Sequence, residues 1–211
     1  APAGLTFNPD GSYSFDPGNA AYDGLAQGAT TVVTVTFSAT ADGQSDTGTL
    51  SLTVTGTNDG PVASAVTASG PEDGGAILVT PVSTDADAGD TASYAIAGES
   101  GPVNGSVVVN GNGTFSYTPD PDFAGTDSFE YVVTDGEGAT STATATITVA
   151  GTDDAPVAED ASEAAVENGA VVAGSVSATD VDSAPISYAV VGTAPAGLTF
   201  NPDGSYSFDP G

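Results

Sequence analysis

The sequence predicts an all-β protein built from antiparallel Greek-key β-sandwiches in tandem. Three observations support this prediction. Short segments alternate apolar and polar residues with a period of two, turn sequences rich in Gly separate them, and no stretch keeps a helical period beyond two turns. Seven or so short strands in about 95 residues is the density typical of a sandwich.

Four segments give the clearest strand signal. Residues 31–39, 49–55, 114–118 and 128–134 read TVVTVTFSA, TLSLTVT, TFSYT and SFEYVVT. Because successive side chains of a strand point to opposite faces, each segment places Val, Leu, Phe or Tyr on one face and mainly Ser or Thr on the other. We therefore expect half-buried strands.

Turn sequences lie between these strands. PDG occurs at 9–11 and again at 202–204, ADG at 41–43, NGNG at 110–113 and DGEG at 135–138. Gly and Asn tolerate the positive φ angles of tight turns, so these segments predict hairpin connections.

An exact repeat sets the organisation of the chain. Residues 1–18, APAGLTFNPDGSYSFDPG, recur unchanged as residues 194–211, a period of 193. An identity of this length is not chance, and we expect the chain to be a window onto a longer tandem array.

A weaker repeat lies inside the first. Residues 56–63 resemble 151–158, and residues 72–87 resemble 167–182, both with a shift of 95. The 193-residue period thus holds two related domains. We expect 63–157 to be a complete domain.

The flanking segments are then parts of a split domain. Residues 1–62 form its C-terminal part, and residues 158–211 form the N-terminal part of its next copy. Joining 158–211 to 19–62 would complete one domain. We therefore expect a neighbouring chain, arranged head to tail, to complete the split domain, besides the adjacent tandem domains of the same protein.

Composition excludes many functions. The chain has 28 Asp and Glu and no Lys, Arg, His or Cys, for a formal charge of −28. It cannot clamp phosphates, bind nucleic acid electrostatically or build a Ser-His-Asp site. No segment is apolar enough to insert in a membrane. We predict no enzyme activity, no nucleic-acid partner and no membrane insertion.

The same composition leaves disorder as the alternative. Only 41 of 211 residues are Val, Ile, Leu or Phe, and a low apolar content with high net charge is typical of disordered chains. A disordered linker has no reason to alternate, however, so the period-two pattern favours a folded chain.

Acidic residues occupy equivalent places in the two domains. Glu72 and Glu167 are expected to precede the first strand of their domains, and an Asp-x-Asp pair follows it as Asp85 and Asp87 or as Asp180 and Asp182. The remaining candidates lie in late turns or in the two junctions, namely Asp42, Asp135, Asn58, Asp59, Asp153 and Asp154.

These oxygen ligands predict calcium sites. In extended backbone, residues i and i+2 point the same way, so an Asp-x-Asp pair aims two carboxylates at one point. The two charges repel unless a cation accepts them. Ca²⁺ takes six to eight oxygen ligands and suits this set.

Several segments resemble a known family. VENGAVVAGSVSATDVD at 166–182 resembles the opening of a cadherin repeat, and TDGEGATSTATATITVAGTDDAPV at 134–157 resembles its close. Residues 122–138 are similar to bacterial cadherin-like repeats. Residues 8–43 resemble the repeat named after Vibrio, Colwellia, Bradyrhizobium and Shewanella.

The resemblance implies tandem Ig-like or cadherin-like sandwiches with Ca²⁺ at each junction. Carried over, the 151–156 junction would use Glu72, Asp153, Asp154, Asp180 and Asp182. The 56–61 junction would use Asn58, Asp59, Asp85, Asp87 and Asp135. The mid-domain Asp-x-Glu of cadherin repeats has no clear match, although Asp120, Asp122 or Asp127 could substitute.

The resemblance also implies a function. Such modules form the stalks of giant type I-secreted bacterial adhesins of the repeats-in-toxin class. We therefore expect a calcium-stiffened extender that is extracellular and lies on the cell surface. Two alternatives stay open, a module that binds a glycan or protein and a module for homophilic adhesion.

Overall fold

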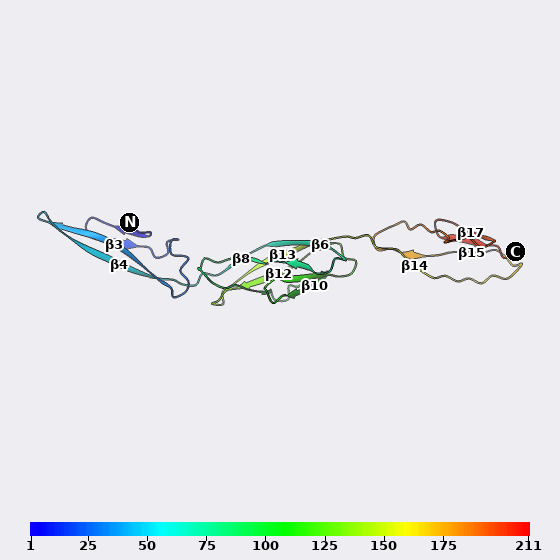
Figure 1. Cartoon of the computed structure of the whole chain (residues 1–211), viewed down its shortest axis with the longest axis horizontal. Coiled ribbons are helices and arrows are strands. Elements are labelled where there is room, and N and C mark those ends of the chain that lie inside the picture. The colour runs from blue at the N-terminus through cyan, green and yellow to red at the C-terminus, as the bar shows by residue number, and fades with distance from the viewer. The chain divides into compact units, whose positions relative to one another are not determined.

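The chain is all-β, as its sequence predicts. A computed structural model describes residues 1–211 and contains eighteen strands (Figure 1). No helix of the structure has the length and hydrophobicity that a membrane span requires. The chain divides into two compact units, residues 1–150 and residues 151–211.

Most of the first unit is a β-sandwich. Its nine strands are β5 (Val62–Ser64), β6 (Val66–Pro71), β7 (Ile77–Val79), β8 (Val82–Thr84), β9 (Ser93–Ile96), β10 (Gly105–Val109), β11 (Phe115–Pro119), β12 (Gly125–Thr134) and β13 (Thr140–Ala150). A four-stranded sheet has the order β6-β13-β12-β9 and a three-stranded sheet the order β10-β11-β7, while β5 pairs with β8.

The predicted alternation builds the core of this sandwich. Phe115 and Tyr117 on β11 are fully buried, and so is Tyr131 on β12, while their strand neighbours Ser116 and Glu130 are more exposed. The rings of Phe115 and Phe129 meet edge to face with centroids 5.3 Å apart. Tyr117, Tyr131 and Phe115 are the largest fully buried side chains, which suits a chain that is poor in Leu and Ile.

The first strand of the sandwich divides its pairing between two partners. β5 pairs antiparallel with β8, whereas β6 pairs parallel with β13 over six residue pairs. The break falls at Ala65, between β5 and β6. One pair is therefore parallel, where the sequence predicts antiparallel strands throughout, because alternation reports which face is buried and not the direction of the neighbour.

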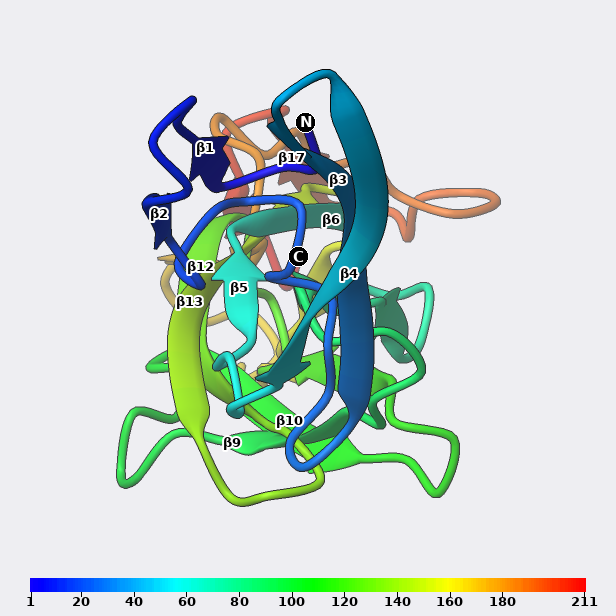
Figure 2. The ribbon, with the colours of Figure 1, turned by 90° about the vertical axis from the view of Figure 1, so that its left-hand side faces the viewer.

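The rest of the first unit consists of two hairpins (Figure 2). They contain β1 (Leu5–Phe7), β2 (Tyr13–Phe15), β3 (Thr30–Ala41) and β4 (Gln44–Thr55). Asp42 and Gly43 connect β3 to β4, both with positive φ, as a two-residue hairpin turn requires. Burial decreases along β3, from Val33 at 9% exposed to Phe37 at 36% exposed.

The second unit is also formed by strands. They are β14 (Val157–Ala158), β15 (Val172–Ser175), β16 (Ala178–Thr179), β17 (Leu198–Phe200) and β18 (Ser205–Phe208). β15, β18 and β17 form an antiparallel sheet in that order, and β14 pairs with β16.

Because β11 is buried and β10 is exposed, we expect substitutions on these two paired strands to differ sharply in their effect on the free energy of unfolding. Phe115→Ala on β11 removes a ring that is 0% exposed and should lower the free energy of unfolding by about 3–5 kcal/mol. Val108→Ala on the paired strand β10 removes a side chain that is 62% exposed and should change it by about 0.5 kcal/mol or less. Denaturant unfolding measures both, and equal losses would contradict this core.

Candidate metal centre

An acidic site lies where the segment 56–61 meets the sandwich of the first unit. Three segments supply it: the linker itself, the loop 85–90 that follows β8, and the turn 135–138 between β12 and β13. Each segment is a turn or linker rich in Asp, Asn and Gly, and none is a strand.

The turn that begins at Asp135 is organised by its own carboxylate. Asp135 is 7% exposed, and its Oδ1 accepts hydrogen bonds from the backbone N–H groups of Glu137, Gly138 and Ala139 at 3.1, 2.6 and 2.7 Å. Its Oδ2 accepts a bond of 2.9 Å from the Asn58 side-chain amide. Asp135 thus ties the linker to the end of β12.

The loop 85–90 is tied to the linker in a second place. Asp87 is 5% exposed, and its Oδ2 accepts a 2.9 Å hydrogen bond from the backbone N–H of Asp59. The N–H of Asp87 in turn donates to Asp85 Oδ1 at 2.9 Å. A tight turn therefore positions this Asp-x-Asp pair, and not the extended backbone on which the sequence argument relied.

Carboxylates converge between these segments. Asp85, Asp90 and Asp135 each place an oxygen within 4.8 Å of the others. Asp90 joins the loop to the turn, because its Oδ1 accepts hydrogen bonds from the N–H of Thr91 at 2.6 Å and of Gly136 at 3.3 Å. Asp90 is a candidate ligand that the sequence did not single out.

Buried oxygens without a hydrogen-bond partner accompany this cluster. They are Asn58 Oδ1, Asp87 Oδ1 and Asp90 Oδ2. A buried acceptor needs a donor or a cation, and the chain has no Lys, Arg or His to provide one. The residues present therefore fit a hard divalent cation, which prefers carboxylate and amide oxygens.

The local electrostatics agree with this arrangement. The pKa of the Glu137 carboxyl is raised by desolvation and then by the negative charges of Asp90, Asp135 and Asp87. The pKa of Asp135 is lowered, first by the hydrogen bond from Asn58 and then, against partial desolvation, by the backbone N–H groups of its turn. The site thus disfavours the charged form of Glu137 and favours the charged form of Asp135.

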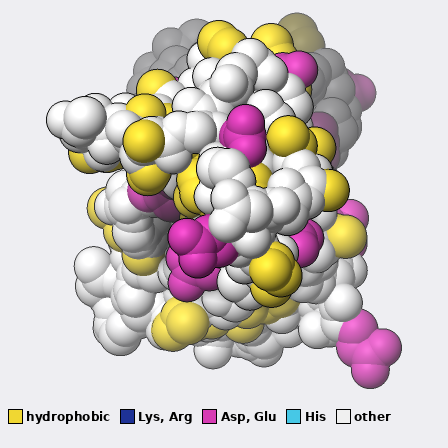
Figure 3. All heavy atoms as spheres, turned by 90° about the vertical axis from the view of Figure 1, so that its right-hand side faces the viewer, with side chains coloured by type: hydrophobic (Ala, Val, Ile, Leu, Met, Phe, Trp, Pro, Cys, Tyr) yellow, Lys and Arg dark blue, Asp and Glu magenta, His cyan; other side chains and the backbone are white.

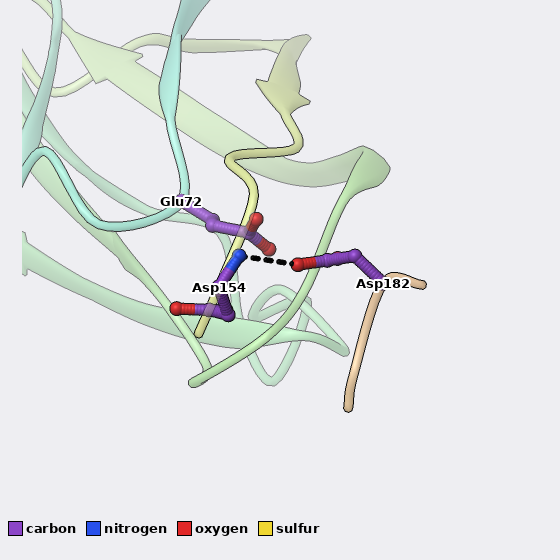
Figure 4. A group of neighbouring side chains, drawn as sticks. All are labelled: Glu72, Asp154 and Asp182. Carbon is purple, nitrogen blue, oxygen red and sulfur yellow. Dashed lines mark hydrogen bonds between the residues drawn. The ribbon is translucent and has the colours of Figure 1, made fainter. Parts of the chain in front are cut away.

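Part of the same arrangement recurs in the second unit. Asp154 N–H donates to Asp182 Oδ2 at 2.8 Å, and Asp182 N–H donates to Asp180 Oδ1 at 3.0 Å, which repeats the contacts of Asp59, Asp87 and Asp85 with a shift of 95. Figure 4 draws the first of these bonds. Asp153 Oδ1 accepts a 3.4 Å bond from the Ser183 hydroxyl.

The other candidates lie in different surroundings. Glu72, also drawn in Figure 4, is 8% exposed in the first unit, and its N–H donates to the Ala150 carbonyl at 3.0 Å. Since Glu72 and the residues from Asp153 onward belong to different units, their shared site stays a prediction. Asp42 lies in the β3–β4 turn, and Glu167 is exposed in a turn of the second unit.

Asp127 has a structural role that the sequence did not reveal. Its carboxylate is 6% exposed and accepts hydrogen bonds from the N–H groups of Val103, Asn104 and Ser128 and from the Tyr117 hydroxyl. Burial opposes ionisation, but these bonds outweigh it and keep the pKa of Asp127 below its usual value. Both of its oxygens are thus already engaged within the domain.

Family comparisons agree with the fold. Residues 58–151 match the bacterial cadherin-like domain, and residues 153–211 match the bacterial Ig domain. The chain therefore carries cadherin-like and Ig-like β-sandwich domains in tandem, which confirms the predicted fold class. Domains of these kinds are structural and typically non-catalytic, and they are typical of extracellular surface proteins.

Solved cadherin structures share this fold. The protocadherin gamma C5 EC1-3 structure is 12% identical with a TM-score of 0.58, over 97% of this chain and 74% of that one. The protocadherin gammaB4 extracellular domain is 15% identical with a TM-score of 0.52, over 99% of this chain and 38% of that one. The gamma B7 EC1-4 structure is 18% identical with a TM-score of 0.50.

These structures are longer than the chain. The match to the gamma B7 structure includes 96% of this chain but only 54% of that structure. No protein with a curated description matches the sequence.

The Asn58–Asp135 contact makes a prediction for titration. In chelator-treated protein, Asn58→Ala removes the donor that contributes most to lowering the pKa of Asp135, so that pKa should rise toward the ordinary value. The pKa of Asp135 is lower in the folded chain than its unfolded value of about 4. Ionised Asp135 therefore stabilises the fold above about pH 4, and this stabilisation is lost as the pH falls through the folded pKa. The variant should therefore lose it at a higher pH.

Carbon-13 NMR of the Asp135 carboxyl measures this shift directly. Asn112→Ala is the matched control, because Asn112 lies in the β10–β11 turn and bonds only to Thr114. An unchanged Asp135 titration in Asn58→Ala would contradict the role given to Asn58.

Proposed function

We propose that this chain is a calcium-stiffened extender segment of a long bacterial cell-surface adhesin, which holds a binding tip away from the cell. The observation that carries this proposal is the acidic cluster at the 56–61 segment. It lies where one domain follows another along the chain, and its oxygens come from the linker and from the adjoining sandwich.

In this proposal, Ca²⁺ is held by Asn58, Asp85, Asp87, Asp90 and Asp135. The ion would supply the positive charge that the chain lacks, and it would occupy the buried oxygens of Asn58, Asp87 and Asp90 that have no partner. The contacts of Asn58 and Asp59 with the sandwich already fix the course of the linker. A bound ion would raise the free energy needed to move the linker away from the sandwich.

The 151–156 segment would be stiffened in the same way by Glu72, Asp153, Asp154, Asp180 and Asp182. The recurrence of the Asp59–Asp87 contact as Asp154–Asp182 supports this extension. A series of domains with stiff junctions behaves as a nearly one-dimensional rod, which is what a stalk requires.

Uniform negative charge suits a stalk as well. The face shown in Figure 3 has Asp and Glu side chains separated by neutral and apolar ones, with no cationic side chain among them. Neighbouring stalks of this composition repel one another, which keeps them apart. Secretion by a type I route and membership of the repeats-in-toxin class belong to the same proposal.

Calcium titration tests the proposal. Adding Ca²⁺ to chelator-treated chain should raise its melting temperature, since a ligand at 100 times its Kd stabilises the folded state by about 2.7 kcal/mol. Small-angle scattering should show a larger maximum dimension with Ca²⁺ than with EDTA, because flexible junctions shorten the average molecule.

A matched pair of variants assigns the effect to the site. Asp87→Asn with Asp135→Asn should remove most of the response at the 56–61 segment. Asp46→Asn with Asp203→Asn changes the net charge equally, at carboxylates that bond only within their own turn or strand, and should leave the response intact. If EDTA alters neither the melting temperature nor the maximum dimension, the extender proposal is wrong.

A further inference from the structure

Two of the three segments that supply the acidic site flank a separate pair of strands. The 56–61 segment leads into β5, and the loop 85–90 follows β8. β5 and β8 form a two-stranded sheet of their own, outside the four-stranded and the three-stranded sheets. Both segments join the end of this pair at which Val62 lies opposite Thr84. Any movement of the pair therefore moves the candidate ligands on both segments.

Apolar packing does little to hold this pair on the sandwich. Val62 is 60% exposed and Val82 is 48% exposed. Within the two strands only Ala63 and Ser83 are half-buried, and both side chains are small. Because so little apolar area is buried, the attachment of the pair depends largely on hydrogen bonds to the sandwich.

The hydroxyl of Tyr131 on β12 makes the central hydrogen bonds. This side chain is 0% exposed, and its hydroxyl lies at the other end of the pair, where Ser64 is opposite Val82. The hydroxyl shares its proton between the carbonyl oxygens of Ser64 and Val82, the latter at 2.9 Å, and accepts the Val82 N–H at 3.3 Å. One buried hydroxyl thus bonds to both strands of the pair.

Two further hydroxyls contact the pair, each on one strand only. The Tyr94 hydroxyl lies 2.8 Å from the Ser83 hydroxyl on β8. The Ser141 hydroxyl accepts the Ala63 N–H of β5 at 3.1 Å. Of these three hydroxyls, only that of Tyr131 joins both strands to β12, the strand that ends at the turn of Asp135.

We propose that Tyr131 is a positioning residue of the candidate metal site. Its hydroxyl holds the strand pair that carries Asp59 and Asp87 in place relative to β12, which carries Asp135. The inference rests on the proposed calcium function for the identity of the ligand, and on the hydrogen bonds of Tyr131 for the geometry.

The effect of Tyr131 on binding follows from preorganisation. Ligands that are already held together lose less conformational freedom when an ion binds, so the ion binds more tightly. Removal of a group that orients metal ligands typically lowers metal affinity by about 10–100-fold. Tyr131 would act in this way although it touches no ligand atom of the acidic cluster.

Amide hydrogen exchange of the full chain in EDTA tests the positioning without any ion. Tyr131→Phe keeps the buried ring and removes only the hydroxyl, so the core should stay packed. The Asp59 N–H bonds to Asp87 Oδ2 and so joins the two segments that flank the strand pair. It should exchange about tenfold faster in the variant, because local opening of the pair separates these segments.

Tyr117→Phe is the matched control. Tyr117 is also 0% exposed, and its hydroxyl donates to Asp127 Oδ2 and to the Asn104 carbonyl, both at 3.0 Å. Neither partner lies in the three segments that supply the acidic site. This variant should also lower the melting temperature, yet it should leave the Asp59 exchange rate within about twofold of the unsubstituted chain.

Calcium affinity is the second readout. When the carboxyls of Asp85, Asp90 and Asp135 are followed by carbon-13 NMR, Tyr131→Phe should raise the Kd for Ca²⁺ by about tenfold or more. Tyr117→Phe should leave this Kd unchanged. Ser141→Ala removes a hydrogen bond to β5 alone, so it should change both readouts in the same direction by a smaller factor. It decides the question if Tyr131→Phe does not fold.

Loss of calcium binding and loss of positioning give different results. If no carboxyl of the unsubstituted chain responds to Ca²⁺, the extender proposal is wrong, and the Asp59 exchange rates in EDTA still decide the role of Tyr131. An Asp59 exchange rate that Tyr131→Phe leaves unchanged, or that Tyr117→Phe raises equally, would overturn the inference. So would a Kd for Ca²⁺ that is the same in Tyr131→Phe and in the unsubstituted chain.

Discussion

Mutual repulsion among carboxylates, with no cation in the chain to offset it, is the constraint on which the junction depends. Asp85, Asp90 and Asp135 place oxygens within 4.8 Å of one another although the chain contains no Lys, Arg or His. Backbone N–H groups offset part of this cost, as at Asp135, whose Oδ1 accepts three of them. The buried oxygens of Asn58, Asp87 and Asp90 retain unused acceptor capacity. The turns are thus shaped to hold negative charge in one place, which is unfavourable unless a cation shares it.

The sandwich provides the rigidity that this arrangement needs. The long strands β12 and β13 pair over ten residues, and the turn between them carries Asp135 at the end of a fully buried row of side chains that includes Tyr131 and Val133. β8 leads directly into the loop 85–90. Asp127, held by Tyr117 and three backbone N–H groups, is a carboxylate of a different kind, because its charge is satisfied within the domain. The acidic residues therefore serve two physical roles that their composition does not distinguish.

Much of this could be predicted from alternation and repetition, and the remainder depends on tertiary contacts. Strands such as 114–118 and 128–134 follow from a period of two, because burial on one face leaves that pattern in the sequence. The predicted residues Asn58, Asp59, Asp85, Asp87 and Asp135 meet in one region of the structure. Asp90 was missed because the signal was repetition, and the position equivalent to Asp90 with a shift of 95 is Pro185. Asp42 is followed by Gly as Asp135 is, yet it lies at the tip of a two-residue hairpin, and sequence does not reveal what a turn faces.

The carboxylates at the 56–61 segment are expected to bind one class of ligand, a hard divalent cation. Carbon-13 NMR of the side-chain carboxyls during addition of Ca²⁺ to chelator-treated protein tests it most directly. The signals of Asp85, Asp90 and Asp135 should shift together and saturate, while that of Asp46, which bonds only to the N–H of Thr47, should not move. Weak shifts that do not saturate and are shared equally by every carboxyl group would contradict the claim.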